Sequence, residues 1–145
     1  MALAAKLRRA PVRLATGAFI LNSGVNKLSA DEGTAAWLQA TAANALPIVK
    51  RVQPKLFAKI LAAGEITVGA ALLIPVVPAG LAGIALVGFG GALTAMYIRN
   101  PAWHDRYLRP TAEGTAYAKD VWLLGAGVGL VVDAALTESP ITATE

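Results

Sequence analysis

Glu65 is the residue of this chain that points most directly to chemistry, because it lies inside an apolar run. The run covers residues 56–77 and is long enough to cross a bilayer, whose hydrocarbon core needs about 20 apolar residues in a helix. A carboxylate at that depth costs roughly 2.5–3.5 kcal/mol, so it must be paired, protonated or facing a wet cavity. Glu65 therefore predicts a membrane location and marks the first place to look for a site.

A partner for Glu65 is expected on the preceding apolar block, which would run antiparallel beside it. Glu65 lies about 15 Å into its own span, and Asn22 lies about 7 Å deeper than Lys27. We expect a contact between Asn22 and Glu65, with Lys27 or Lys59 covering it. Two interpretations stay open: a proton or cation relay or the floor of a small-ligand site, and an interhelical hydrogen bond that only holds the helices together.

The remaining titratable residues give weaker signals. His104 is the only histidine, and no further metal ligands surround it, so we expect a solvated or headgroup-contacting side chain and no metal site. Asp120 and Asp133 lie near opposite ends of the last apolar block, where a charge costs little. The chain has no cysteine, which excludes disulfides, thiol redox chemistry and thiolate metal sites. We expect no resident cofactor.

Apolar residues make up 56% of the chain, and they gather in blocks separated by charged stretches. This pattern is typical of a multi-pass protein of the cell membrane. It predicts an all-α fold, a four-transmembrane-helix bundle in a single domain, 1–145. The spans are expected at about 11–28, 54–76, 79–98 and 116–136. The net charge is +4, and most basic residues flank the apolar blocks. We therefore expect them to interact with lipid headgroups rather than with nucleic acid.

The first block could be mistaken for a signal peptide. Asn22 and Asn26 interrupt its apolar centre, which suits a bundle helix better, so we expect the N-terminus to be retained. Arg13 and Lys27 bound this centre, and both are expected to reach towards headgroups.

The first loop, 29–53, should carry a helix that lies in the membrane interface. Ser29 and Glu32 have the spacing of a capping box, and Pro47 should end the helix. The second and third spans should form a tight antiparallel hairpin, because Pro75 and Pro78 bracket a short turn between them.

Small residues recur at four-residue spacing on the last two spans, which lets helix backbones approach closely. Intramolecular packing is the expected role, and self-association through the last span is the alternative. The packing positions are Gly88, Gly91, Gly125 and Gly129.

Orientation is left open by the charges. Both chain ends should lie on one membrane face and both long loops on the other. Nine Lys or Arg residues map to the loop face and four to the terminal face, which favours cytoplasmic loops. The four are clustered before the first helix, which favours a cytoplasmic N-terminus instead.

Three short motifs resemble those of the DoxX-type membrane proteins. Residues 13–19 read Arg-Leu-Ala-Thr-Gly-Ala-Phe, and residues 24–28 read Gly-Val-Asn-Lys-Leu. Residues 64–73 begin with Gly-Glu and continue with a spaced glycine and two leucines. The resemblance covers roughly residues 12–136 and includes the four-span plan.

The resemblance implies a four-helix bundle distantly similar to the membrane subunit of thiosulfate:quinone oxidoreductase and to the vitamin K epoxide reductase core. Some members look like the membrane anchor of a complex with superoxide dismutase and a sulfurtransferase. The lack of cysteine departs from the thiol-active relatives. We therefore expect a bacterial, non-catalytic membrane subunit or anchor for a redox or envelope-homeostasis complex, with lipids and a protein partner.

The alternative function is an oxidoreductase subunit, or a carrier of a quinone, another small molecule or protons, that uses the polar site at Glu65. A homo-oligomer is the alternative to a hetero-complex. Catalysis by this chain alone is not expected.

Overall fold

The computed structural model describes residues 2–138, all of whose regular structure is helical. Residues 139–145 lie outside the described part of the chain. The elements are α1 (Ala2–Leu28), α2 (Glu32–Ala45), a 3₁₀ helix η1 (Pro47–Arg51), α3 (Pro54–Leu73), α4 (Ala79–Arg99), α5 (Thr115–Ala118) and α6 (Val121–Glu138). Prolines set several of these limits as predicted: Pro54 opens α3, and α2 ends before Pro47.

Three segments are long and apolar enough to cross a membrane, and they are Pro54–Leu73, Ala79–Arg99 and Thr115–Thr137. The last of these contains α5 and most of α6. α1 is a continuous helix that extends back to Ala2, beyond the predicted start near residue 11, but it is not among the three. A fourth crossing by α1 and an interfacial position for α2 therefore remain predictions.

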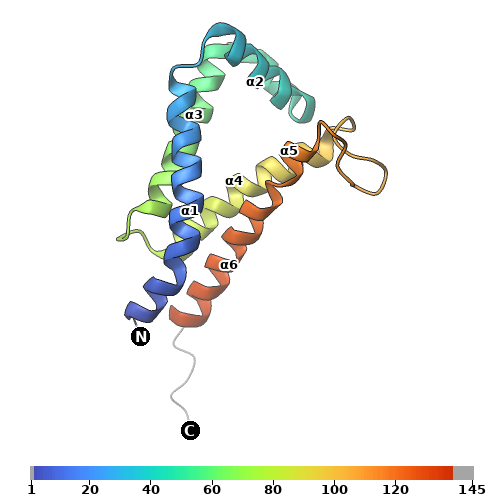
Figure 1. Cartoon of the computed structure of the whole chain (residues 1–145). Helices are drawn as coiled ribbons and strands as arrows, with labels where there is room; N and C mark the ends of the chain where they lie inside the picture. The colour runs from blue at the N-terminus through green and yellow to red at the C-terminus, as the bar shows by residue number, and fades with distance from the viewer. Residues whose placement is uncertain (1, 139–145) are drawn as a thin grey trace.

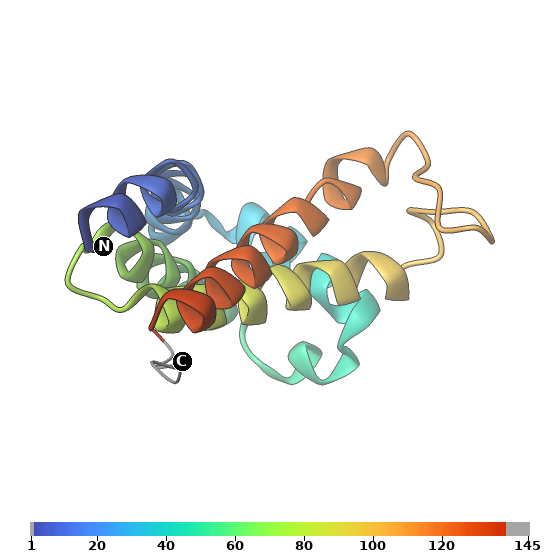
Figure 2. The same cartoon turned by 90° about the horizontal axis from the view of Figure 1, so that it is seen from below.

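The long helices form two antiparallel pairs, α1 with α3 and α4 with α6 (Figure 1). The pairs meet where α1 begins and α6 ends, and they diverge towards α2 and the loop between α4 and α5. Figure 2 shows the same two pairs from below, with that loop projecting beyond its own pair. The predicted tight hairpin is wrong, because α3 and α4 separate after the turn at 74–78 and each packs mainly on another helix.

Glycines allow close backbone approach inside each pair. A Cβ at Gly69 of α3 would lie 2.6 Å from the backbone N of Leu21 in α1. A Cβ at Gly90 of α4 would lie 2.5 Å from the backbone N of Leu124 in α6. Neither backbone nitrogen can move aside cheaply, so these contacts require glycine.

The predicted packing glycines lie elsewhere. A Cβ at Gly88, Gly125 or Gly129 would meet no atom within 4 Å, and one at Gly91 would lie 4.0 Å from the end of the Leu124 side chain. These positions therefore do not make the close helix contacts within the described chain. The four-residue spacing therefore predicted the wrong faces of α4 and α6 as the faces that pack closely on a neighbouring helix.

Arg13 joins α1 to the C-terminal end of α3. Its guanidinium donates hydrogen bonds to the carbonyls of Leu72 at 2.7 Å, Val77 at 3.0 Å, Ala71 at 2.9 Å and Ile74 at 2.8 Å. The last carbonyls of a helix have no partner within it, so Arg13 satisfies the carbonyls of Ala71 and Leu72; that of Ile74 also accepts from the Val77 N–H. The expectation that Arg13 reaches for headgroups is therefore wrong.

The first loop begins differently from its prediction. The N-cap of α2 is Asp31, whose Oδ1 accepts a hydrogen bond from the Thr34 N–H at 2.7 Å. Ser29, expected in that role, donates to the Asn26 carbonyl at 3.3 Å. Gln39 then donates from α2 to the carbonyls of Val49 and Val52 and so fastens η1 against it.

The predicted last span is interrupted at residues 119–120, between α5 and α6. Here the N–H groups of Asp120, Trp122 and Leu123 donate to carbonyls three residues back, as in a 3₁₀ helix. The preceding loop, 100–114, is not helical, as its two prolines predict. Trp103 in this loop stacks on Tyr117 with ring centroids 3.7 Å apart, which fixes the start of α5.

Candidate functional site

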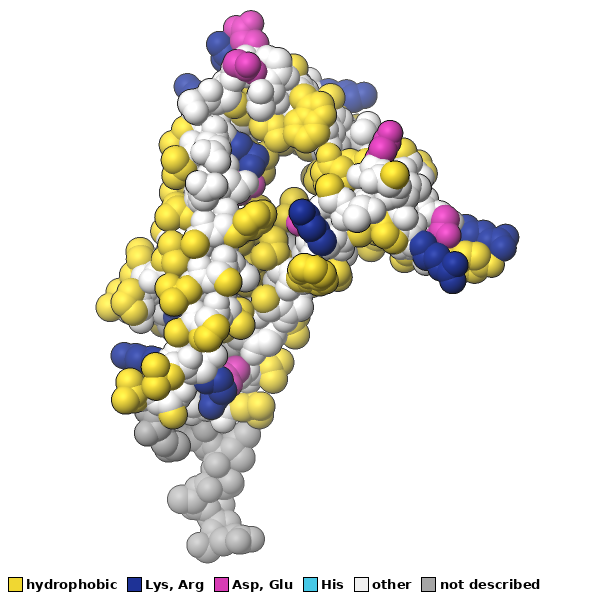
Figure 3. Space-filling model, in the orientation of Figure 1, with side chains coloured by type: hydrophobic (Ala, Val, Ile, Leu, Met, Phe, Trp, Pro, Cys, Tyr) yellow, Lys and Arg dark blue, Asp and Glu magenta, His cyan; other side chains and the backbone are white. Residues whose placement is uncertain are grey.

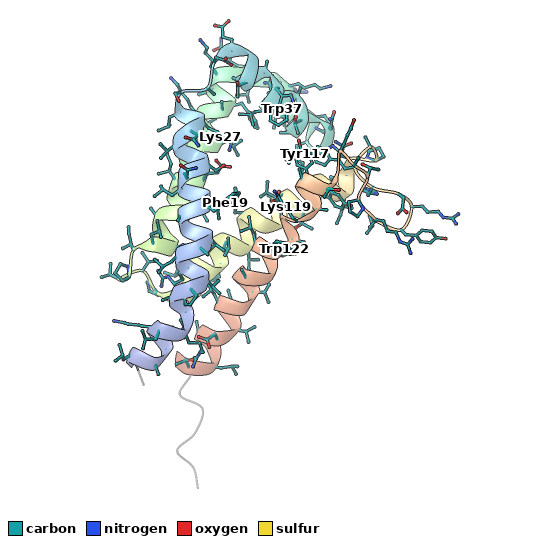
Figure 4. The ribbon with its side chains drawn as sticks, viewed as in Figure 1. Phe19, Lys27, Trp37, Tyr117, Lys119 and Trp122 are labelled. Carbon is teal, nitrogen blue, oxygen red and sulfur yellow. The ribbon has the colours of Figure 1, made fainter. Side chains whose placement is uncertain are left out.

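A cavity of about 320 Å³ lies between the diverging helix pairs, underneath α2. We call it the inter-pair cavity. Figure 3 shows the molecule hollowed on this side, between α1 and the α5–α6 segment. Figure 4 shows Phe19 and Lys27 on one side of the gap, Tyr117 and Lys119 on the other, and Trp37 below α2. The volume is within the usual range for small-molecule sites, about 300–1,000 Å³.

The Lys27–Glu65 pair forms one wall of the inter-pair cavity. Lys27 Nζ lies 2.9 Å from Glu65 Oε2 and 2.7 Å from Ser23 Oγ. Glu65 is 5% exposed, while the Lys27 side chain retains 19% of its surface. The ammonium therefore faces the cavity, and the carboxylate lies behind it and balances its charge.

Lys27 is the one donor among the described residues that reaches Glu65 Oε2. The 2.9 Å distance from Lys27 Nζ makes a close ion pair, and no further hydrogen bond supports that oxygen. The carboxylate therefore depends on Lys27 for neutralisation inside the protein.

The structure places Lys27, and not Asn22, against Glu65. Asn22 is exposed on α1, so the expected Asn22–Glu65 contact does not form, and Lys59 is exposed on α3. Ser23, the next residue, faces the ion pair instead, and its Oγ accepts a hydrogen bond from Lys27 Nζ at 2.7 Å. Ser23 and Lys27 are four residues apart and share a helix face, and this spacing could have identified Ser23 from the sequence.

Lys119 and Asp120 lie on the opposite wall, and sequence reasoning assigned neither to a site. Both line the inter-pair cavity, although Asp120 was expected to be an anchor at the membrane interface. The 3₁₀ interruption between α5 and α6 gives these two residues their position. No signal in the sequence predicts that interruption, because Lys119 and Asp120 are compatible with a continuous helix.

Apolar side chains complete the cavity. Trp37 and Leu38 of α2 lie over it, and Ile20, Phe89 and Leu123 come from three of the long helices. Ile20 also belongs to the core where the two pairs meet. The cavity thus combines a few charged groups with mostly apolar walls, as ligand sites in proteins do.

A second hollow, of about 370 Å³, lies beside the turn between α3 and α4 and is lined in part by Lys6, Arg9 and Arg13. It is larger than the inter-pair cavity but is a weaker candidate. Arg13 is engaged by four carbonyls, and Arg9 donates to Asp133. Two of its cations therefore hold helices together.

His104 holds the loop between α4 and α5. Its Nδ1 lies 2.8 Å from the Asp105 carbonyl oxygen and its Nε2 lies 2.9 Å from that of Ile98. These hydrogen bonds raise the pKa of His104, the Asp105 carbonyl contributing most. Among residues 2–138, no cluster of three or more His, Asp or Glu side chains is placed to hold a metal ion.

Comparison with known proteins gives one match. A family model described as DoxX matches residues 9–98, which run from α1 to the end of α4. The matched segment contains Lys27 and Glu65, and it ends before Lys119 and Asp120. No curated protein and no solved structure matches the chain.

Proposed function

Because the chain belongs to the DoxX family and is an integral membrane protein, we propose that it binds a lipid-soluble small molecule in the inter-pair cavity. The observation that carries the proposal is the Lys27–Glu65 ion pair, which forms a wall of that cavity. Ionisable residues inside membranes are expensive and usually mark functional sites. An ion pair needed only to join helices would not have to face a hollow.

α1 is the fourth membrane span in this proposal. Its 27 residues would extend about 40 Å, more than the roughly 30 Å of a hydrocarbon core. It packs antiparallel along α3, which is long and apolar enough to cross, so both helices traverse the same thickness. Arg9 and Arg13 lower its mean hydropathy, but both are bonded to neighbouring helices.

Access from the lipid supports a lipid-soluble ligand. With the long helices upright in the membrane, the hollow between α1 and α5–α6 faces sideways (Figure 3). α2 lies over the cavity at the loop face, and its Trp37 suits a position at the membrane interface. A molecule dissolved in the bilayer could therefore enter without crossing α2. A quinone, one of the ligands considered from the sequence, belongs to this lipid-soluble class.

The proposal can be tested by filling the cavity. Ala42 on α2 lines it, whereas Ala40 on the same helix is exposed and does not. We expect Ala42→Phe to abolish retention of a lipid-soluble molecule and Ala40→Phe to leave it unchanged. Mass spectrometry of organic extracts from the purified proteins measures this. Equal retention by both variants would refute the proposal.

A second candidate function, as membrane anchor for a protein partner, is favoured by the loop at 100–114. Tyr107 is 63% exposed there, and the guanidinium carbons of Arg106 and Arg109 lie 4.6 Å and 5.7 Å from its ring centroid. Asp105 accepts hydrogen bonds from the backbone N–H groups of Tyr107 and Arg109. The loop is thus ordered although it projects from the helices.

Exposed Tyr and Arg residues on an ordered surface are typical of protein interfaces. We expect the variant Tyr107→Ala to lose a partner that wild-type protein retains on purification in mild detergent. Trp122→Ala, which removes an exposed aromatic residue from α6, is the control. Retention of the same partner by both variants would argue against this loop as the docking surface.

A further inference from the structure

Building on the proposed function, we infer that the molecule bound in the inter-pair cavity carries an anionic head group, which Lys119 and Lys27 hold from opposite walls. Figure 4 shows the two lysines on the two sides of the gap, Lys27 from α1 and Lys119 from the segment between α5 and α6. Both line the same cavity. The inference is based on Lys119, whose side chain has no hydrogen-bond or ion-pair partner among the described residues.

Lys119 lines the cavity without an ion pair or hydrogen bond from its side chain to the described residues. In this respect it differs from Lys27, Arg9 and Arg13, all of which bind protein groups. Lys119 is exposed, and the attraction of the neighbouring Asp120 leaves its ammonium without a direct hydrogen-bond acceptor. An anionic group on a ligand would supply the missing partner and form a charge-assisted hydrogen bond.

The carboxylates around the cavity do not take that role. Glu65 lies behind Lys27 and balances the charge of that residue, at 2.9 Å. Asp120 follows Lys119 directly in the sequence and is close enough for the two charges to attract, but it makes no ion pair with Lys119 and is less exposed. Lys119 is therefore the charged group on this wall that is most accessible to a ligand.

The rest of the cavity fits the tail of an amphiphile. Phe19, Ile20, Phe89 and Leu123 form apolar walls next to the two lysines. A cavity of about 320 Å³ holds a head group and the first part of a chain, and the sideways opening lets the remainder extend into lipid. The ligand class is thus a single acidic head, carboxylate or phosphate monoester, on an aliphatic or isoprenoid tail.

The test uses four probes with the same saturated tail of 14 carbons: tetradecanoate, tetradecanol, tetradecylamine and tetradecyl phosphate. Each is added to the full-length protein in a non-ionic detergent, and the bound fraction is measured by native mass spectrometry. We expect tetradecanoate to bind about tenfold more tightly than the alcohol, which is the effect of one charge-assisted hydrogen bond, and the amine to bind no better than the alcohol. Tetradecyl phosphate, compared with tetradecanoate, separates the two kinds of acidic head.

Three variants locate the effect. Lys119→Gln should remove most of the preference for the acid and leave binding of the alcohol unchanged. Lys119→Arg should keep the preference. Lys59→Gln, on an exposed lysine of α3 that does not line the cavity, is the matched control and should behave as wild type. Thermal unfolding in the same detergent verifies that each variant is folded.

The outcomes separate the two proposals. If none of the four probes binds, the proposed function fails, and the inference fails with it. If the alcohol binds as tightly as both acids, a lipid-soluble ligand stands but its anionic head is refuted. Preference for the amine would assign the head group to Asp120 and overturn the inference. An unchanged preference in Lys119→Gln would overturn the role of Lys119.

Discussion

The guanidinium of Arg9 on α1 donates from Nε to Asp133 Oδ2 on α6 at 2.5 Å, and this ion pair joins the two helix pairs where they meet. Arg8 donates to the other carboxylate oxygen at 2.8 Å. The inter-pair cavity lies at the other end, where no comparable bond between described residues connects α1 with α6. Asp133 was expected near the membrane interface, where a charge costs little; the structure adds that it joins the two pairs at the end from which they diverge.

Replacing Asp133 should therefore loosen the junction. Asp133→Asn removes the charge that balances Arg9, whose side chain is only 10% exposed. Because Arg9 would keep a largely buried charge without its partner, we expect a lower unfolding temperature for this variant. Thermal unfolding in detergent measures it. Glu113→Gln, on an exposed loop residue, should change nothing, and equal unfolding temperatures for the two variants would contradict the assignment.

The glycines give a sharper test of the two helix pairs. Gly69→Ala and Gly90→Ala each place a Cβ 2.5–2.6 Å from a backbone nitrogen of the neighbouring helix, which must move away. We expect each to destabilise the protein by about 1–3 kcal/mol, the usual cost of overpacking. Thermal unfolding in detergent again measures the change.

Gly64→Ala and Gly88→Ala are matched controls on the same two helices, because a Cβ at either position meets nothing within 4 Å. They should leave the unfolding temperature unchanged or slightly raised, since alanine favours helices over glycine. If all four variants behave alike, the pairing of α1 with α3 and of α4 with α6 is wrong.

Local rules predicted the helix limits from the sequence. Pro47 and Pro54 restrict the backbone in the same way whatever surrounds them, so the C-terminal end of α2 and the start of α3 could be located directly. The burial of Glu65 followed from the apolar run around it. These inferences need only neighbouring residues.

Helix pairing could not be predicted in the same way. In lipid the apolar faces are not driven together by water, so small residues on several faces compete as contacts. Gly69 and Gly88 look equivalent in the sequence, but only Gly69 meets a neighbouring backbone. Asn22 was predicted on the helix face where the structure has Ser23. This error of one residue corresponds to a rotation of about 100° around a helix of 3.6 residues per turn. Depth alone cannot resolve that difference.

Arg13 is expected to be essential for the end of α3. Arg13→Gln should destabilise the protein by roughly 3 kcal/mol or more, because four carbonyls lose a shared cationic donor. Arg13→Lys should recover only part of this loss, since an ammonium lacks the planar set of donors. Arg8→Gln, at a more exposed arginine, is the comparison and should cost less. A full recovery by lysine would show that charge alone matters at this position.

The loop at 100–114 should lose stability as pH rises through the pKa of His104. Both ring nitrogens face backbone carbonyls, which accept hydrogen bonds and cannot donate them, so only the imidazolium form satisfies both contacts. The Asp105 carbonyl, followed by that of Ile98, raises the pKa of His104 in the folded protein above its ordinary value. The contribution to stability is therefore complete below the unfolded pKa of about 6.5 and is lost above the folded value.

Two measurements test this pH dependence. As the only histidine of the chain, His104 gives an unambiguous NMR titration, which should show a raised midpoint. In parallel, the unfolding temperature of wild type should fall relative to that of His104→Gln between about pH 6 and pH 8.5, because glutamine does not titrate in this range. Parallel curves for the two proteins, or a midpoint below the ordinary value, would show that the imidazolium does not hold the loop.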